Sequence, residues 1–477
     1  MRQRPSAQER AAACGIAGLL LCVALDSSPA AVRAEAMPAP SPGPSMTLKQ
    51  AVDFALAHNP SIVQAQAQAI AAAALLTRNR SGQLPQVAAN AQSLLQRQSA
   101  NNAGTFAQFG LQPTANFSQN TSQLLGTANV INFTSTLEAR QAKRSYDAAV
   151  QNVRLTRQQT TLAVESGYYA LVQDADLVKL ANEDLAYQRT LRDIADANFR
   201  AGKVAGIDRL KAQVQLTSSQ QRLASAQADV DDARQNLAQL IGAQPAQGFL
   251  LPTTVELPVL PSLDRAGLET LALSQRPEVA IAQANVDNAR YANALVDAPN
   301  RPVVQLSGGW GNQTSPTANA LAFDQCTLAN QNLPLAVAPL NCSPGASHFY
   351  NVSLSSTWSL PLLDWGTVHA AHLSARATID SNQANLDAAR RQAVVDVDEA
   401  LRRVEVQRQN LALAGANADI AKQVAQTSQV QYKVGLIGQI EVTAAQQTYL
   451  QAARDYLIAQ IGYVLSAEKL KLATGSL

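Results

Sequence analysis

The stretch Phe199-Arg-Ala-Gly202, followed by Ile207-Asp208, returns 233 residues later as Tyr432-Lys-Val-Gly435, followed by Ile440-Glu441. Each copy has an aromatic residue, a basic residue, a small apolar residue and a glycine, and then an aliphatic–acidic pair. A glycine at the end of a long helical pattern predicts a chain reversal, because glycine tolerates φ > 0 at little cost. Two such turns in one chain indicate two structurally equivalent halves.

The patterns on either side of these turns repeat as well. Pro60 and Pro85 are 25 residues apart, and so are Pro277 and Pro302. A capping box at Thr47-Leu-Lys-Gln50 predicts the first helix, and apolar residues in steps of three and four predict long coiled-coil helices. The predicted organisation is a signal peptide (1–36), a first repeat (37–246, with a β-hairpin at about 86–131 and a coiled coil at about 137–242), a Pro-rich linker (247–262) and a second repeat (263–477, with a β-hairpin at about 302–361 and a coiled coil at about 367–473).

Composition and the N-terminus indicate an exported protein that does not bind nucleic acid. The 477 residues carry a formal charge of only +2, and 15% are charged, whereas phosphate binding needs a concentrated basic surface. An Arg-containing start, an apolar stretch and Ala34-Glu35-Ala36 match a cleavable export signal. Two cysteines remain after its removal, Cys326 and Cys342, and we expect them to form a disulfide in a long polar loop.

The second hairpin carries a β pattern suited to a membrane. From His348 to Pro361, apolar and polar residues alternate, which is typical of an outer-membrane strand with one face toward lipid. Trp310, Tyr350 and Trp358 fit the lipid–water interface. The alternative is a soluble hairpin with one solvated face. The mature chain lacks 18 consecutive apolar residues, so no transmembrane helix is expected.

Four candidate strands are too few to close a barrel, and an open sheet edge in lipid leaves backbone groups unpaired. Several copies of the chain must therefore share one barrel. The repeated order of short helices, β-hairpin, long helix, glycine turn and return helix resembles the TolC family of outer-membrane efflux proteins, as does the Leu-Lys-Leu-Ala-Thr-Gly475 ending. The resemblance implies a mostly α fold in which a homotrimer forms a 12-stranded transmembrane β-barrel on an α-helical periplasmic barrel.

The same resemblance assigns roles to the turn residues. It implies that the periplasmic tip docks on an adaptor protein, which connects it to an inner-membrane pump, through turns that contain Gly202, Gly206, Gly435, Leu436 and Gly438. It also implies that Asp208, Glu441 and Tyr432 line the aperture, with Asp208 and Tyr432 as a linked pair. A simpler interpretation of the two acids is that a carboxylate is favoured at any helix N-terminus.

No motif for catalysis or for a cofactor stands out. His369 and His372 lie three residues apart at a helix start, but an isolated His pair is more often a surface feature than a metal site. We therefore expect a protein that is not an enzyme and has no cofactor, located in the outer membrane and extending into the periplasm. The expected function is passive conduction of small toxic compounds. The alternatives are a duct for protein secretion and a non-conducting periplasmic coiled-coil protein.

Overall fold

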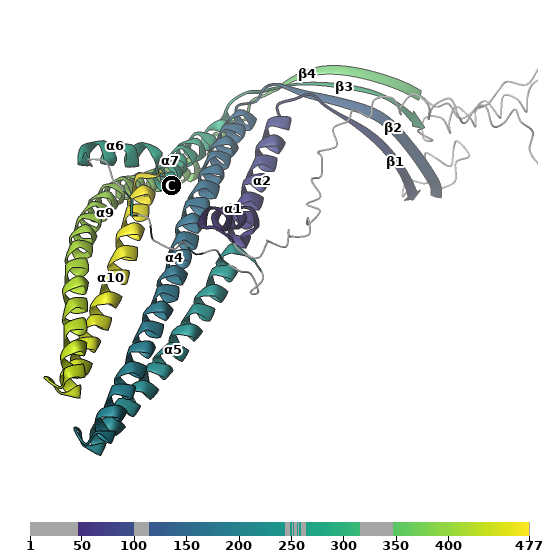
Figure 1. Cartoon of the computed structure of the whole chain (residues 1–477). Helices are drawn as coiled ribbons and strands as arrows, with labels where there is room; N and C mark the ends of the chain where they lie inside the picture. Colours follow the sequence, from purple (N-terminus) through teal and green to yellow (C-terminus); the bar gives the residue numbers. More distant parts are fainter. Residues whose placement is uncertain are drawn as a thin grey trace, which may run out of the picture.

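The computed structural model describes residues 46–99, 114–243, 249, 251, 255, 257–258, 264–314 and 347–476. Two long helical hairpins lie beside each other, and a curved sheet extends from one end of them (Figure 1). The predicted signal peptide, most of the Pro-rich linker, and Cys326 and Cys342 lie outside the described residues, so the signal peptide and the disulfide stay predictions.

The first half begins with helices α1 (Leu48–His58) and α2 (Pro60–Ser81). The predicted capping box is confirmed: the Gln50 backbone N–H donates to Thr47 Oγ1, and Gln50 Oε1 accepts from the Thr47 N–H. After the hairpin, α4 (Phe133–Arg200) begins at an Asn132 cap and α5 (Gly206–Ile241) returns along it. At 1.5 Å per residue, the 68-residue helix α4 is about 100 Å long.

The second half has the same order of elements. It contains α6 (Arg265–Gln275), α7 (Pro277–Val296), a short 3₁₀ turn (Ala298–Asn300), α9 (Thr367–Val434) and α10 (Gln439–Thr474). Helix α9 has 68 residues like α4, and α10 has 36 residues like α5. None of the helices in the described part of the chain combines the length and apolar character needed to cross a bilayer.

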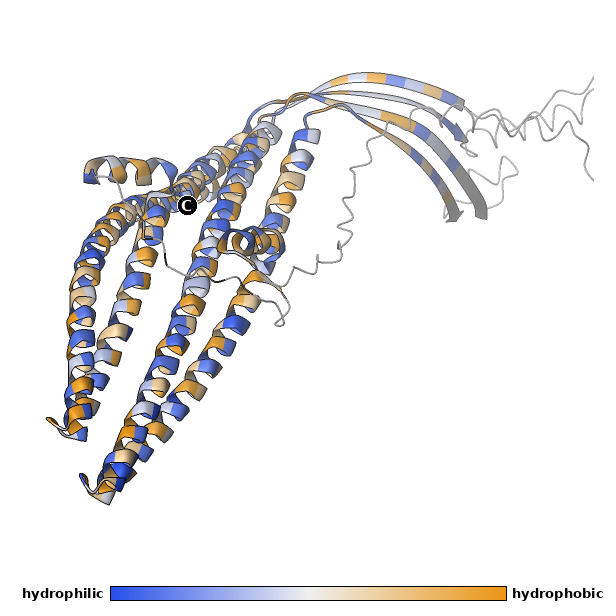
Figure 2. Ribbon diagram, viewed as in Figure 1, coloured by the Kyte–Doolittle hydropathy of each residue, from blue (hydrophilic) through white to orange (hydrophobic). Residues whose placement is uncertain are grey.

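The helices pack through narrow apolar seams instead of one thick core. Val164, Tyr168 and Leu171 of α4, which follow one another in steps of four and three, are buried against Leu237 and Ile241 of α5 and against α1. Smaller clusters join α6, α9 and α10, and α7 to α9. Apolar residues recur along the long helices (Figure 2), and many of the large ones are exposed in a single chain.

The two hairpins join into one antiparallel sheet of order β1 (Gln86–Ser99), β2 (Thr114–Ile131), β3 (Val303–Thr314) and β4 (Ser347–Thr357). Pairing of β2 with β3 connects the two halves. Strand β4 ends at Thr357, although the alternation extends to Pro361. The ladder ends there because β3 begins at Val303, which pairs with Thr357, and Pro302 before it has no N–H to continue the ladder. Trp358 lies just beyond the ladder, and its indole N–H donates to the Asn300 carbonyl at 2.9 Å.

Candidate functional site

The two turns at the free end of the helical hairpins are built in the same way. In the first, the Gly202 N–H donates to the Phe199 carbonyl and the Lys203 N–H to the Asn198 carbonyl, both at 2.9 Å. In the second, the equivalent bonds run from Gly435 and Leu436 to the carbonyls of Tyr432 and Gln431, at 3.0 and 2.9 Å. Both are Schellman motifs, which satisfy the last carbonyls of a helix.

Only two of the four turn glycines use the left-handed conformation. Gly202 has φ 72° and Gly435 has φ 83°. Gly206 instead begins α5, and Gly438 caps α10 with an extended backbone. The explanation from turn geometry therefore covers Gly202 and Gly435. Leu436, which follows the second turn, is 76% exposed and is available for contact with another molecule.

The two tip acids lie at helix N-termini and have different partners. Glu441 accepts a hydrogen bond from the Gly438 backbone N–H at 2.5 Å, which caps α10. Asp208 lies in the first turn of α5, and its carboxylate is 3.7 Å from the Lys211 ammonium. Both positions agree with the favourable interaction of a carboxylate with a helix N-terminus, and neither acid bonds to the other among the described residues.

Tyr432 lies near Asp208 but does not bond to it. Its side chain is 4% exposed and packs against Leu191 and Val442, and its hydroxyl has no hydrogen-bond partner among the described residues. Burial raises the pKa of the Tyr432 phenol, and the nearby charge of Asp208 raises it further. Tyr432 and Asp208 both line a tip cavity of about 420 Å³, together with Lys203 and Lys433.

Gln439, which no sequence pattern singles out, makes the direct polar link at the tip. With its amide oriented so that both ends are satisfied, this buried side chain donates to the Asp208 carbonyl at 2.7 Å and accepts from the Ala212 N–H at 2.9 Å. These two backbone groups are one helical turn apart in α5. The first residue of α10 is therefore bonded to the backbone of α5, which joins the two hairpins.

The first hairpin also contains acidic residues, further from the tip, that the sequence patterns do not predict. Asp184 of α4 is 1% exposed and accepts hydrogen bonds from Arg222 of α5 at 2.6 Å and from Gln188 at 3.2 Å. Glu165 faces α10. Burial and the charge of Glu468 raise its pKa to about 7, although Lys471 acts in the opposite direction. The heptad positions predict which side of each helix faces inward, but they do not predict a charge there.

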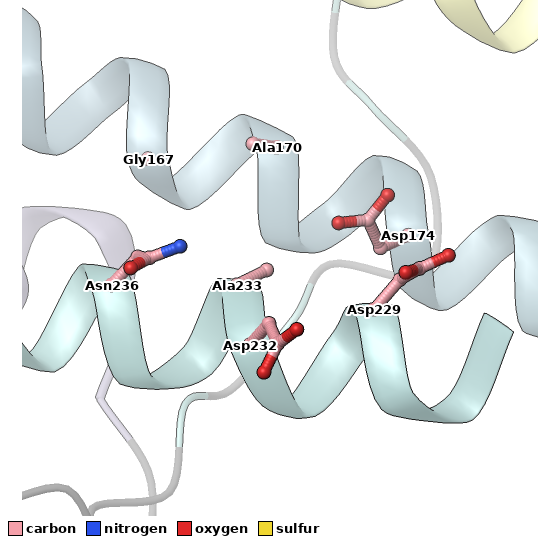
Figure 3. A pocket seen from close by; sticks show the side chains of 7 residues that line it. All are labelled: Gly167, Ala170, Asp174, Asp229, Asp232, Ala233 and Asn236. Carbon is pink, nitrogen blue, oxygen red and sulfur yellow. The ribbon is translucent and has the colours of Figure 1, made fainter. Parts of the chain in front are cut away.

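Three aspartates line a cavity of about 320 Å³ between α4 and α5. Figure 3 shows Asp174 and Asp229 approaching each other across the two helices, while Asp232 lies about one turn further along α5. Burial and the Asp229 charge raise the pKa of Asp174, and Arg454 of α10 lowers it.

Neither these acids nor the histidines form a metal site in the described residues. No group of three or more His, Cys, Asp and Glu side chains there is placed to hold a metal ion. The ring of His372 instead bonds Asn293 at 3.0 Å and Asp297 at 2.8 Å. His372 therefore links α9 to the end of α7.

The sheet has one apolar face and one polar face, as its strand register shows. Paired residues of neighbouring strands point to the same side. One face carries large or small apolar residues, namely Val87, Ala89, Leu124, Gly126, Ala128, Leu306, Gly308, Trp310, Tyr350, Val352 and Leu354. The other face is mainly uncharged and polar, with Gln86, Asn90, Gln123, Thr127, Gln305, Ser307, Asn351, Ser353 and Ser355.

The predicted interface aromatics all lie at the borders of the apolar face. Trp310 and Tyr350 are paired neighbours, 62% and 86% exposed. The next row outward on the same face is polar, with Ser122, Asn312 and His348. Trp358 is 64% exposed at the opposite border, next to the helices.

Comparison with known proteins gives the family. The sequence model of the outer membrane efflux protein family matches residues 51–243 and 268–476. Protein CyaE of Bordetella pertussis is 27% identical over 382 residues, which are 76% of this chain and 72% of that protein.

Known structures share the fold. The outer membrane protein VceC from Vibrio cholerae superposes with a TM-score of 0.71 and 16% identity, over 90% of this chain and 96% of that one. The open state of the MtrE outer membrane channel of Neisseria gonorrhoeae superposes with a TM-score of 0.70 and 19% identity, over 90% and 88% of the two chains. The resemblance inferred from the paired glycine turns is confirmed. The chain therefore belongs to the outer membrane efflux protein family, and it is an outer-membrane efflux channel that extends into the periplasm.

Proposed function

We propose that three copies of the chain form one channel that passively conducts small toxic compounds out of the cell. The supporting observation is the four-stranded sheet. Within the described residues, β1 and β4 each pair on one side only, so both edges are open. In lipid, unpaired backbone groups cost several kcal/mol each. Pairing β1 of one copy with β4 of the next satisfies both edges, and three copies then give the predicted 12-stranded barrel.

The exposed face of α9 supports the same assembly. Val406, Leu413, Ile420 and Val434 lie at heptad spacing, and each is 52% exposed or more. An apolar stripe of this kind along a long helix needs a neighbouring helix to cover it. In a trimer this neighbour is a helix of the adjacent copy, and the long hairpins then enclose a tunnel.

The polar face of the sheet supports conduction without chemistry. In the proposed barrel this face lines the lumen, where Asn, Gln, Ser and Thr side chains offer weak hydrogen bonds and no fixed charge. A solute can then pass without being held strongly, as conduction requires. Energy comes from an inner-membrane pump, which a periplasmic adaptor connects to the glycine turns at the tip, and we propose no enzymatic step.

At the tip, Asp208 and Glu441 each become a ring of three carboxylates in a trimer. Such rings favour cations in a narrow aperture. We expect Asp208→Ala to lower the preference of the channel for cations, because it removes one carboxylate ring from the tip. Tyr432→Phe should add little to this change, since the Tyr432 hydroxyl has no hydrogen-bond partner among the described residues. Unchanged cation preference in Asp208→Ala would contradict an aperture role.

The decisive experiment combines conductance with a toxicity assay. The mature protein, purified in detergent, is inserted into planar bilayers, and cells that lack it are exposed to a panel of toxic compounds. Stepwise currents and increased sensitivity, both reversed by the intact gene, support the proposal. A monomer that is stable without detergent and gives no current would indicate a non-conducting coiled-coil protein. Loss of an exported protein without any change in sensitivity would indicate secretion.

A further inference from the structure

The apolar face of the sheet contains a groove of about 360 Å³. Its floor is formed by Gly126 of β2 and Gly308 of β3, which are paired in register. Trp310 and Tyr350 form one wall, and Val352 flanks the floor on β4. The groove is shallow and opens widely on the apolar side of the sheet.

The fold does not need glycine at either floor position. Neither residue has positive φ. A Cβ at Gly126 would lie 3.7 Å from its nearest neighbour, the Gly308 carbonyl oxygen, and a Cβ at Gly308 would lie 3.6 Å from the Asn351 carbonyl oxygen. These are ordinary van der Waals distances, so alanine fits at both positions.

The glycines of the opposite face behave differently. A Cβ at Gly309 would lie 2.5 Å from Asn351 Oδ1, and a Cβ at Gly311 would lie 2.7 Å from the Ser122 carbonyl oxygen and 2.8 Å from the Phe349 ring. Packing against the backbone therefore explains Gly311, whereas the close atom at Gly309 is the end of the flexible Asn351 side chain. Packing does not explain Gly126 and Gly308. Glycine weakens a strand, and where packing does not need it, it often marks the close approach of another molecule.

The position of the groove along the strands indicates the ligand. Trp310 and Tyr350 lie next to the polar row Ser122–Asn312–His348, which marks the outer border of the apolar face. The glycine floor is one row closer to the helices and therefore deeper in the membrane. Beyond it lies another apolar row, Ala128–Leu306–Leu354. A chain entering from the border passes the two aromatic rings and then reaches the hollow.

We propose that this groove binds the acyl chain of an outer-membrane lipid. The apolar floor and walls hold the hydrocarbon, and the Trp310 indole N–H and Tyr350 hydroxyl contact the polar linkage of the lipid at the interface. The groove lies within β2, β3 and β4 of one copy, so it does not depend on a neighbouring chain. The inference rests on the outward orientation of the apolar face in the proposed barrel.

Native mass spectrometry of the detergent-purified protein tests the proposal, with dipalmitoyl phosphatidylethanolamine as the titrated probe. We expect saturation at one tightly held lipid per chain. Gly308→Leu fills the groove and should weaken this binding roughly ten-fold or more, since the acyl chain loses its apolar contacts. Ala89→Leu is the matched control, because it enlarges a residue of the same face on β1, outside the groove.

Two further arms keep the test decisive. If Gly308→Leu does not fold, the double variant Gly126→Ala with Gly308→Ala narrows the groove with methyl groups that fit, and it should also weaken binding. Equal lipid retention by wild type and the groove variants would overturn the proposal. So would a groove variant that separates into monomers while Ala89→Leu stays assembled, because a second copy would then occupy the groove. Bilayer conductance of each sample separates the two proposals: a conducting protein without a bound lipid contradicts only the lipid site.

Discussion

The α4–α5 and α9–α10 hairpins have the same helix lengths and the same Schellman turn, but different interiors. In the first hairpin, buried Asp184 of α4 is paired with Arg222 of α5. In the second, none of the ion pairs among the described residues joins α9 to α10, and close packing such as the Tyr456 ring near Gly415 takes this place. One backbone plan can therefore add a buried ion pair to its apolar contacts or rely on close packing alone.

The second hairpin is also attached to the first near its ends. At the upper end, Arg154 and Gln158 of α4 donate to the Gly475 carbonyl at the end of α10, at 3.0 and 3.1 Å. At the tip, Gln439 bonds the α5 backbone. Between these two contacts lies an open cavity of about 770 Å³, which is lined by residues of α4, α5 and α10. The first hairpin therefore has an ion pair between its own two helices, whereas the second hairpin depends on its hydrogen bonds to the first hairpin near both ends.

Arg222→Ala should have the largest effect on stability. It leaves the carboxylate of Asp184 buried without its cation, which costs about 3 kcal/mol. The control in the second hairpin is Arg403→Ala, because the Arg403–Glu399 pair is exposed on α9 and should contribute about 0.5 kcal/mol or less. Denaturant unfolding of both variants measures the difference. Equal losses would mean that the interior of the first hairpin does not depend on charge.

Gln439→Ala should have the next largest effect, and it should appear at the tip. The change removes both hydrogen bonds to the α5 backbone, worth about 2 kcal/mol together, and should increase the population of the open channel roughly 30-fold. Single-channel recordings measure open probability, with Gln409→Ala on the exposed surface of α9 as control. An unchanged open probability would show that the tip contacts do not hold the second hairpin.

Local chemistry made much of this fold predictable. The Thr47–Gln50 capping box, the glycine turns and the heptad positions Val164, Tyr168 and Leu171 depend on residues close in sequence. The faces of the sheet were predictable because alternation alone assigns side chains to faces. The end of β4 was not, because it depends on where the paired strand β3 begins, at Val303.

The candidate site was less predictable than the fold. The turns were located correctly, but the link between Tyr432 and Asp208 was assigned on resemblance, and the structure has Gln439 as the bonded side chain. Asp184 and Glu165 were missed for a related reason. Periodicity indicates which side of a helix is buried, but only packing between distant segments determines which polar groups meet there.

Because the two turns share one geometry, we expect their left-handed glycines to contribute equally to stability. Gly435→Ala and Gly202→Ala should each lower the free energy of unfolding by about 1 kcal/mol. Both residues have positive φ, and an added Cβ would meet no neighbouring atom, so the backbone conformation is the only source of strain. Gly438→Ala should cost less, since its backbone is extended. Hydrogen exchange of the tip amides measures all three. A large difference between Gly435→Ala and Gly202→Ala would show that the two turns are energetically distinct.

Glu165 offers the finest test of the contact between the two halves, because it lies on α4 and faces Glu468 and Lys471 of α10. Its folded pKa of about 7 lies above the ordinary value of 4.5. The folded protein therefore keeps a proton that the unfolded chain releases, and stability falls as pH rises from about 4.5 to about 7.

Glu165→Gln keeps the shape without the charge and should remove this decline. Partial exposure limits the effect to below about 1 kcal/mol. Melting midpoints compared at about pH 5 and about pH 8 should show a larger advantage of Glu165→Gln at the higher pH. An equal stability advantage of Glu165→Gln at both pH values would mean that Glu165 is ionised in the folded protein and that its contact with α10 is solvated.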